Sequence, residues 1–592
     1  MINCYTTIIA LILLYCGISS YSFAIPSPTI ATATDHISAP ILSRDNPIPP
    51  IVYTIAGSDS GGGAGIQADL HAIHAFGCHG CSAITCLTAQ NSVGVTAVHF
   101  PPVSFLAEQL QTLLSDLPPA AIKIGMLGNR EIAVQIGKFL EQVKKESERK
   151  VWVVLDPVMI STSGHRLIQE DAQEAMIEHV FPYVDILTPN KFEAEALLRR
   201  KLESVTDIEE GASDLLAMGV PTVIIKGGHS LDSGPEARWA QDYIVSSGEM
   251  PEEPRLCDCL QRGVWIRTPR FDSKNTHGTG CTLSSAMASA LALGANERLK
   301  EKWRSRGALS SIQAIDAFCL AKAYVTEGIA RGVQLGSGPG PVAHTSFPSS
   351  HHYFPTISGD PTKDPSSFLQ MEFPETNGLA VDYDSRSKLG RIMPVVDSVD
   401  WVTRLCRIDG ITDIQLRIKD EKDKDRIAKM VRSCQDLCKD AGVRLWVNDF
   451  WEAAIDGGCF GVHLGQEDLY ACAQAAGLDA LKKNKIALGI STHSFGELAA
   501  ALGIKPTYIS LGPVFATDSK DVSFDQQGPE TVANWRQLIP TSIPLVVIGG
   551  IGEVESVIKV RQSGADCAAV IGAITRADNI EKVVSAFNQA MS

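Results

Sequence analysis

The sequence predicts an α/β protein with two domains: an open sheet of mostly parallel strands, followed by a TIM (β/α)8 barrel. The chain has 592 residues with 45% hydrophobic content, which is too long for one ordinary domain and apolar enough to bury several cores. Short apolar runs alternate with helix-compatible stretches in both halves. A stretch rich in Pro, Ser, Thr and Asp at residues 345–385 separates the halves and is predicted to be a linker.

Residues 1–49 are predicted to form a targeting leader. An apolar run around Ile8 to Tyr15 is too short to span a bilayer comfortably, and small residues that suit a signal peptidase follow it. The junction "SYSFAIPS" resembles that of the bipartite leaders that direct proteins into complex plastids. We therefore expect a plastid location without a stable membrane span, with ordinary secretion as the alternative.

Composition points to small-molecule partners. The formal net charge of −15 argues against a surface for nucleic acid or anionic membranes. Most of the 15 cysteines lie scattered in apolar runs, which predicts free thiols in a reducing compartment. Cys78 and Cys81 have C-x-x-C spacing, but no second pair follows at metal-site spacing, so zinc is not expected. The oligomeric state stays open, with a homo-oligomer among the candidates.

The first domain is predicted over residues 50–344. Its clearest strand-like runs are "IVYTIAGS", "CSAITCLTA", "AAIKIGML", "VWVVLDPVM", "DILTPN" and "TVIIKGG". Polar residues of "DPVM", "TPNKFEAE" and "KGGH" stand where such runs end. Parallel sheets bind ligands at the carboxyl ends of their strands, so these residues are expected to meet at one site.

Two glycine-rich segments accompany these strand ends. "AGSDSGGGAGIQADL", residues 56–70, is neither a dinucleotide fingerprint nor a Walker A motif, and alone it would suit a tight turn. In "HGTGC", Gly278, Thr279 and Gly280 allow close backbone approach just before a helix predicted to begin near Cys281. Unpaired N–H groups at that helix start would stabilise a phosphoryl group in transfer.

These segments, together with "TAQNS", "KIGML", "LDPVM" and "NTHGTGCT", resemble hydroxymethylpyrimidine/phosphomethylpyrimidine kinase, of the ribokinase-like fold, from Ile51 to about Val342. The resemblance implies ATP-dependent phosphorylation of 4-amino-5-hydroxymethyl-2-methylpyrimidine to its phosphate and diphosphate. It implies that Asp69 and Gln90 bind the aminopyrimidine. The residues implied near the Mg-ATP phosphates are Asn190, Glu193, Lys226, Gly278, Thr279 and Gly280, with Asp156 nearby.

Cys281 would then be the general base. A free thiol has a pKa near 8.5, and a helix N-terminus can lower it to about 3.5–7.5, which would make a thiolate accessible at neutral pH. The alternative is a buried cysteine that only fills space. For His277, a loop residue without a catalytic role is the simpler interpretation. A pyridoxal-type kinase is the rival for the whole domain, and Asp69 and Gln90 would discriminate the two.

The second domain is predicted over residues 386–592. Its eight apolar runs are "RIMPVV", "DIQLRIK", "RLWVND", "GVHLG", "KIALGIST", "YISLGPV", "LVVIGG" and "CAAVIGA". Eight such βα units suit a compact TIM barrel, whose active site gathers at the carboxyl ends of the strands. Strand alternation would place Gln415, Arg417 and Lys419 on one face, where neighbouring cations need an anionic ligand. Asp449 and Asp468 suit an Mg²⁺ ion that also takes substrate phosphates, although each alone could be a helix N-cap.

These residues, with "GIST", "LGPVFATDSK" and "VIGGI", resemble thiamine-phosphate synthase from about Leu389 to Met591. The resemblance implies that the pyrimidine diphosphate condenses with 4-methyl-5-(2-hydroxyethyl)thiazole phosphate, with loss of pyrophosphate. Asp449 and Asp468 would hold Mg²⁺. The residues implied for the diphosphate are Gln415, Arg417, Lys419 and Asn448, and those for the leaving group are Ser491 and the catalytic Lys520. Those implied for the thiazole phosphate are Thr517, Ser519, Gly550, Ile571 and Gly572.

The sequence departs from this second family at two positions. Ala516 replaces a usual Pro and Gly572 a usual Ser, and neither change removes a charge or a metal ligand. Since the first reaction makes the substrate of the second, the chain is best interpreted as a bifunctional thiamine-biosynthesis enzyme. The rival hypothesis makes the barrel a non-catalytic thiazole-binding module.

Overall fold

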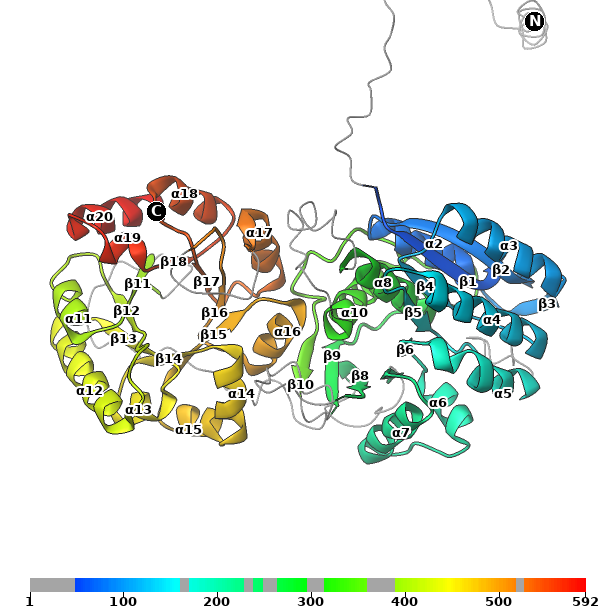
Figure 1. Ribbon diagram of the computed structural model, residues 1–592, viewed down its shortest axis with the longest axis horizontal. Helices are drawn as coiled ribbons and strands as arrows, with labels where there is room; N and C mark the ends of the chain where they lie inside the picture. The colour runs from blue at the N-terminus through cyan, green and yellow to red at the C-terminus, as the bar shows by residue number, and fades with distance from the viewer. Residues whose placement is uncertain are drawn as a thin grey trace, which may run out of the picture. The chain divides into compact units, whose positions relative to one another are not determined.

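The computed structural model describes residues 48–159, 170–227, 238–248, 263–294, 313–358, 389–517 and 526–592. These residues form a ten-stranded open sheet and a closed eight-stranded barrel (Figure 1). The predicted leader, except for residues 48 and 49, lies outside the described residues. Among the helices that are described, none is long and apolar enough to cross a membrane.

The open sheet has a parallel centre and antiparallel edges. Its strands are β1 (Ile51–Asp59), β2 (His79–Gln90), β3 (Val95–His99), β4 (Ala121–Ile124), β5 (Trp152–Leu155), β6 (Ile186–Leu187), β7 (Thr222–Lys226), β8 (Trp239–Ser246), β9 (Val264–Pro269) and β10 (Thr356–Ser358). Their order is β10-β9-β8-β7-β6-β5-β4-β1-β2-β3. The six strands from β7 to β2 in that order run parallel, so their carboxyl ends share one edge.

Helices cover both faces of this sheet. On one face lie α2 (Gly65–Ala75), α8 (Thr279–Gly294) and α10 (Ala314–Arg331). On the other face lie α3 (Val103–Asp116), α4 (Arg130–Glu146), α5 (Glu170–His179), the 3-10 helix at Phe181–Tyr183, α6 (Lys191–Leu198) and α7 (Val205–Ala217). Successive residues of a strand point to opposite faces of the sheet: Val154 packs against the first group of helices and Val153 against the second. The predicted α/β class is confirmed.

The structure shortens the predicted linker. Residues 356–358 form strand β10, which pairs antiparallel with β9, although the sequence places them in a linker that begins at residue 345. Three residues are too few to show a strand period, so this strand left no pattern in the sequence. Residues 359–385 of the predicted linker lie outside the described residues.

The second domain closes into the predicted TIM barrel, with every neighbouring pair of strands parallel. Its strands are β11 (Ile392–Val396), β12 (Asp413–Leu416), β13 (Arg444–Asn448), β14 (Gly461–Leu464), β15 (Ala487–Thr492), β16 (Tyr508–Leu511), β17 (Leu545–Ile548) and β18 (Cys567–Val570). Each of the eight predicted runs contains one of these strands, because an apolar run of four to six residues is typical of a strand buried on both faces.

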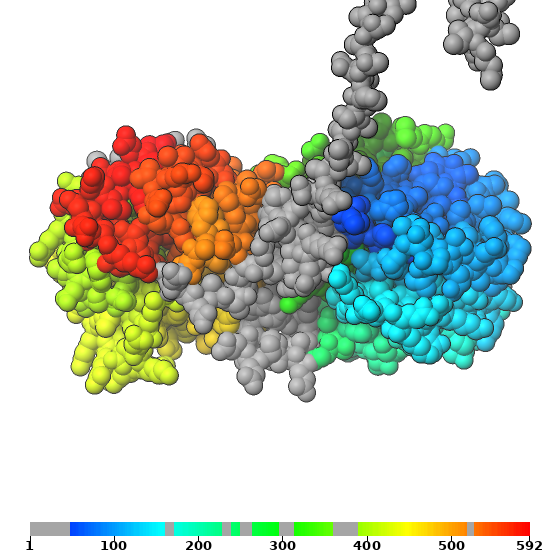
Figure 2. Space-filling view, turned by 45° about the horizontal axis from the view of Figure 1, so that its top comes forward, coloured from blue at the N-terminus to red at the C-terminus, as the bar shows by residue number. Residues whose placement is uncertain are grey.

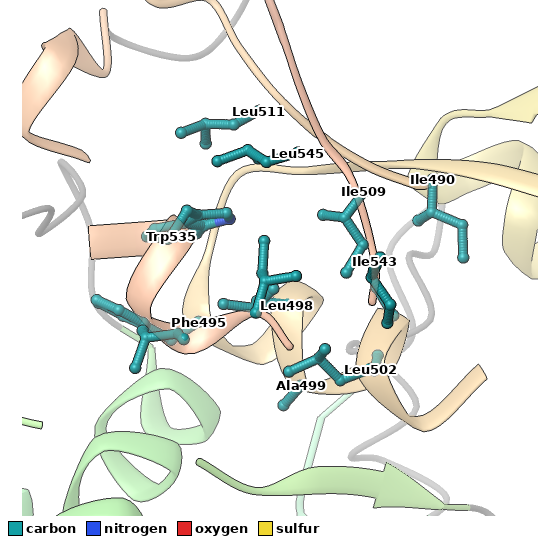
Figure 3. Close-up of a cluster of buried hydrophobic side chains, with 14 of the residues drawn as sticks. Ile490, Phe495, Leu498, Ala499, Leu502, Ile509, Leu511, Trp535, Ile543 and Leu545 are labelled. Atoms are coloured by element: carbon teal, nitrogen blue, oxygen red, sulfur yellow. The ribbon is translucent and has the colours of Figure 1, made fainter. Parts of the chain in front are cut away.

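The helices of the barrel form its outer layer. They are α11 (Val399–Leu405), α12 (Lys424–Ala441), α13 (Trp451–Asp456), α14 (Gln466–Gln474), α15 (Gly477–Lys483), α16 (Phe495–Ile504), α17 (Gly528–Leu538), α18 (Val554–Gln562), α19 (Gly572–Thr575) and α20 (Ile580–Ala590). Figure 2 shows the C-terminal helices, in orange and red, on the outer surface of the barrel. In Figure 3, Leu498 and Leu502 of α16 pack toward the strand residues Ile509 and Leu545.

A buried carboxylate anchors one end of the barrel. Asp413 is fully buried at the start of β12 and pairs with Arg444 at 2.6 Å. It also accepts hydrogen bonds from the Trp446 indole at 2.9 Å and the Gly390 N–H at 2.9 Å. This network joins β12 to β13 and to the residues that precede β11, at the end of the barrel opposite the strand carboxyl termini.

Replacing Asp413 should therefore destabilise the barrel. Asp413→Ala removes the buried carboxylate that pairs with Arg444 and accepts from Trp446 and Gly390, and we expect a loss of about 3–5 kcal/mol in the free energy of unfolding. Urea unfolding followed by tryptophan fluorescence measures it. Glu555→Ala, which removes an exposed ion pair with Lys559 on α18, is the matched control and should leave the transition nearly unchanged. Equal effects of the two substitutions would contradict the anchoring role.

Candidate active sites

A cavity of about 960 Å³ opens at the carboxyl edge of the open sheet. It brings together residues from the ends of the six parallel strands and both glycine-rich segments. Eight of the predicted site residues line it: Gln90, Asn190, Glu193, Lys226, Gly278, Thr279, Gly280 and Cys281. Asp156, expected nearby, lines it as well.

The two glycine-rich segments pack directly against each other. Gly278 has φ +80°, and a Cβ there would lie 1.9 Å from the Gly63 carbonyl oxygen, so only glycine fits. His277 Nε2 lies 3.0 Å from Asp59 Oδ2 and joins the segments by a side-chain contact. Burial opposes ionisation of Asp59, but hydrogen bonds from His277 and from the Gly61 and Ala64 N–H groups lower its pKa. His277 is thus a structural link that sequence reasoning missed.

Three charged residues converge beside the Gly278–Gly280 turn. Lys226 Nζ lies 2.6 Å from Asp156 Oδ1, and a Cβ on Gly280 would lie 3.2 Å from both side chains. Glu193 forms a capping box with Asn190 at the start of α6. Burial raises the pKa of Glu193 to about 7, with Lys226 opposing and Asp156 adding to the shift. Lys226 can leave Asp156 to bind a phosphate, and the carboxylates of Asp156 and Glu193 can then face the metal ion bound to that phosphate.

Cys281 lies in the first turn of α8, as predicted, but its thiol is less acidic than expected. Burial raises the pKa of Cys281 to about 11, even though Lys123 and the Gly65 N–H favour the thiolate. The expectation of a thiolate at neutral pH from the helix N-terminus is therefore corrected. Cys281 lines the cavity and is partly exposed, but desolvation of its sulfur by the residues around it still outweighs these favourable contacts, and Asp69 and Asp156 add to the rise.

Asp69 does not line the cavity, contrary to the direct pyrimidine contact that the sequence suggested. Its carboxylate is fully buried on α2 and binds Lys123 Nζ at 2.7 and 2.9 Å. The hydroxyls of Thr54 and Ser285 donate to it at 2.5 and 2.6 Å. Lys123 itself reaches the cavity. A lysine inside the apolar run "AIKIG" was the signal that sequence reasoning overlooked, because a buried lysine requires an anion.

The predicted barrel residues gather at the carboxyl ends of the strands. Gln415 is on β12, Asn448 ends β13 and Ser491 is on β15. Strand β12 ends at Leu416, so Arg417 and Lys419 lie in the loop after it and not along one strand face as predicted. The Arg417 N–H still donates to the Val396 carbonyl at 2.7 Å, which holds this loop over the end of the barrel.

A hydrogen-bonded chain of buried side chains crosses the barrel under this site. His463 on β14 lies 2.9 Å from Ser491 Oγ and 2.8 Å from the Tyr508 hydroxyl. Tyr508 in turn hydrogen-bonds to Gln415. The structure thus adds His463 and Tyr508 to the predicted set. The polar residues within the otherwise apolar runs "GVHLG" and "YISLG" were the available signal.

The two predicted metal ligands stand on neighbouring strands. Asp449 follows β13 and Asp468 lies in the first turn of α14, just after β14, which pairs with β13. Both side chains are half-buried. Asp449 has φ +68°, a conformation that costs a non-glycine residue free energy and that clusters at functional sites. Asn448 donates a short hydrogen bond to the Asp449 carboxylate.

The predicted thiazole-phosphate residues come from three loops. Gly550 follows β17 with φ +66°, and a Cβ there would lie 2.4 Å from the Ala516 carbonyl oxygen. Glycine therefore permits the segment containing Ala516 and Thr517 to lie against the loop after β17. Ile571 and Gly572 begin α19. Ser519 and Lys520 lie outside the described residues, so their predicted roles stay predictions.

Comparisons with known proteins agree with this two-part organisation. Residues 59–302 match the model of the phosphomethylpyrimidine kinase family, and residues 391–574 match that of the thiamine monophosphate synthase family. The chloroplastic thiamine biosynthetic bifunctional enzyme of Arabidopsis thaliana is 32% identical over 533 residues, which cover 89% of this chain and 90% of that protein.

Two further relatives show the same pattern. A probable chloroplastic thiamine biosynthetic bifunctional enzyme of Oryza sativa is 32% identical over 85% of this chain and 81% of its own length. The hydroxymethylpyrimidine/phosphomethylpyrimidine kinase of Haemophilus influenzae is 38% identical over 50% of this chain and 97% of its own length. These matches favour the thiamine assignment over a pyridoxal-type kinase with a non-catalytic barrel.

The first domain is thus a ribokinase-like pyrimidine kinase and the second a thiamine-phosphate synthase barrel. The chain belongs to the family of bifunctional thiamine biosynthetic enzymes.

Proposed function

We propose that the cavity of the first domain carries out the phosphorylation and that the site at the strand ends of the barrel carries out the condensation. In the first cavity, Gln90 holds the aminopyrimidine, and the Gly278–Gly280 turn with Lys226 and Asn190 holds the phosphates of ATP. The observation that supports this most is that one cavity contains both glycine-rich segments together with Cys281 and Lys226. An acceptor hydroxyl placed between them would face the phosphoryl group and the thiol at once.

In the phosphoryl transfer, Cys281 takes the proton of the substrate hydroxymethyl group. The alkoxide oxygen forms a bond to the γ-phosphorus as the bond to the leaving ADP breaks. Lys226 and the N–H groups at the start of α8 stabilise the charge on the transferred group. Because the thiol pKa is about 11, only a minor fraction of the enzyme holds the base in its active form at neutral pH.

Asp69 acts in this scheme through Lys123. Burial by itself would lower the pKa of Lys123, but Asp69, Cys281 and Asp156 together raise it, so the ammonium stays charged inside the fold. A fixed cation on the cavity wall would stabilise both the thiolate and the developing alkoxide. Asp69 thereby becomes a positioning residue for Lys123, and Gln90 remains the direct pyrimidine contact.

In the barrel, the diphosphate of the pyrimidine binds Gln415, Arg417, Lys419 and Asn448, with Ser491 and Lys520 at the leaving pyrophosphate. The ring amino group stabilises the pyrimidinylmethyl cation that remains, and the thiazole nitrogen attacks it. The phosphate of the thiazole binds Thr517, Ser519 and the backbone N–H groups of Gly550, Ile571 and Gly572. Hydrogen bonds connect Gln415 through Tyr508 and His463 to Ser491. They fix the orientation of the Gln415 and Ser491 side chains.

The donor set of Asp449 and Asp468 fits Mg²⁺. Two half-buried carboxylates on adjacent strand ends leave coordination positions for phosphate oxygens and water, which is the arrangement Mg²⁺ prefers. The ion would neutralise charge on the leaving diphosphate. In the first cavity, Glu193 and Asp156 offer carboxylate oxygens to the Mg²⁺ that accompanies ATP.

The plastid is the proposed location. The relatives from Arabidopsis thaliana and Oryza sativa that match most of this chain are chloroplastic proteins. The "SYSFAIPS" junction in residues 1–49 supports the same compartment from the sequence.

The bifunctional scheme predicts a specific partial reaction for Asp449→Asn. The purified chain, given hydroxymethylpyrimidine, thiazole phosphate and Mg-ATP, should form thiamine phosphate detectable by mass spectrometry. Asp449→Asn should accumulate the pyrimidine diphosphate and form thiamine phosphate about 100-fold more slowly, because metal stabilisation of the leaving group is worth several kcal/mol. A wild-type chain that stops at the diphosphate would refute the synthase function.

The thiol base predicts a rising pH profile for the kinase. The thiolate fraction of Cys281 increases about tenfold per pH unit below its pKa, so kcat/KM for pyrimidine phosphorylation should rise from pH 7 toward pH 11. Cys281→Ser should lose about 100-fold or more in rate and lack this rise. Synthesis of thiamine phosphate from supplied pyrimidine diphosphate is the internal control. A full-rate Cys281→Ser kinase would remove the base role from the thiol.

Gln90 and Asp69 should respond differently to substitution. Gln90→Ala removes a direct contact and should raise the KM for hydroxymethylpyrimidine about tenfold with little change in the KM for ATP. Asp69→Asn leaves Lys123 unpaired and should lower the free energy of unfolding by about 3–5 kcal/mol, together with kcat. Steady-state kinetics and thermal unfolding separate the two. If the Asp69→Asn protein is stable and only its KM for hydroxymethylpyrimidine is raised, Asp69 contacts the pyrimidine directly and the role through Lys123 is refuted.

A further inference from the structure

Four cysteines that the reactions do not use form a cluster on the outside of the barrel. Cys406 caps the C-terminus of α11, Cys434 and Cys438 lie one turn apart on α12, and Cys459 precedes β14. Helices α11 and α12 are neighbours in the outer layer (Figure 1). Each of the four thiols interacts electrostatically with at least one other thiol of the group. Among the described residues no group of this kind is arranged to hold a metal ion.

Of the four cysteines, only Cys406 is partly exposed to solvent. Cys434 and Cys438 are fully buried and Cys459 is 3% exposed, whereas Cys406 is half-buried. The exposed cations Arg404 and Arg407 flank Cys406. An electropositive, partly exposed position is typical of a reactive thiol, and it also attracts anionic reagents.

The sulfur atoms of Cys406 and Cys438 lie 3.8 Å apart. The two sulfur atoms are thus in direct contact, and a disulfide requires them to approach to about 2.05 Å. The hydrogen bond between the two thiols lowers the pKa of Cys406. The same hydrogen bond, together with burial, raises the pKa of Cys438. Because Cys406 is partly exposed and Cys438 is buried in contact with it, Cys406 is the thiol that a reagent reaches first and Cys438 is the one placed to resolve.

We propose that Cys406 is a modification site for small anionic disulfides such as glutathione disulfide, and that Cys438 resolves the adduct into an internal Cys406–Cys438 disulfide. The Cys406 thiolate attacks one sulfur of the glutathione disulfide, which forms a mixed disulfide and releases one glutathione thiolate. Cys438 attacks the Cys406 sulfur and passes its proton to the departing glutathione sulfur, so the second glutathione leaves as a thiol. Two protein thiols are oxidised and one disulfide is reduced to two thiols.

The bond would act on stability and leave catalysis unchanged. Cys406 and Cys438 lie toward the C-terminal ends of their helices, which in a barrel of this kind is the end opposite the strand carboxyl termini. The substrate loops are therefore not strained by the new bond. The closed loop of chain between the two residues restricts the unfolded state, so the oxidised protein should unfold at a higher temperature.

The test treats the reduced, folded full chain with glutathione disulfide, blocks the remaining thiols and maps disulfides by peptide mass spectrometry. Wild type should contain the Cys406–Cys438 link, unfold at a higher temperature and keep its rate of thiamine phosphate synthesis. Cys438→Ser should instead accumulate glutathione on Cys406, and Cys406→Ser should give neither product.

Two controls make the pairing specific. Cys434→Ser removes the neighbouring thiol on the same helix and should still form the link, and Cys472→Ser on α14 should behave as wild type. An unmodified Cys406 in wild type, a stable glutathione adduct without resolution, or a link from Cys406 to Cys434 would each overturn the proposal. Unchanged activity of the reduced variants verifies that they are folded.

Discussion

Both sites of this protein depend on one geometric constraint: strands that pair in parallel end at the same edge of a sheet. In the first domain this edge collects Asp156, Asn190 and Lys226 from β5, β6 and β7, although up to 70 positions separate them in the chain. In the barrel the same constraint is closed into a ring, so the ends of β12 to β18 face one space. Each site therefore combines segments that are far apart in the sequence.

Buried charges then determine what each site can do. In the first domain, Lys123 and Asp69 are fully buried and neutralise one another, while Lys226 and Asp156 form a second pair on the cavity wall. The desolvation cost of such pairs is large, and they contribute fixed charge to a site from which water is largely excluded. The same desolvation raises the pKa of Cys281 to about 11. The burial that strengthens the charged pairs of this cavity thus also opposes ionisation of its thiol.

The cysteines show how one side chain serves different purposes according to its surroundings. Cys281 lines the cavity of the first domain, and Cys567 is fully buried in β18 as a small apolar residue. Cys406 and Cys438 lie in contact on the outer helices of the barrel. Their sequence contexts do not separate these cases, because exposure, neighbouring charge and the distance to a second sulfur are properties of the folded chain.

The sequence by itself determined the two fold classes, the eight barrel strands and the residues that gather at the strand ends, because local apolar runs and glycine turns specify these features directly. It also supplied Gln90, Lys226, Cys281, Asp449 and Asp468. It could not place β10, the end of β12 at Leu416, or the links through His277, Lys123 and His463. These depend on contacts between distant segments. Only the tertiary structure decided that Asp69 pairs with Lys123 in the interior and that burial raises the pKa of Cys281, because both depend on which segments the fold brings around these side chains.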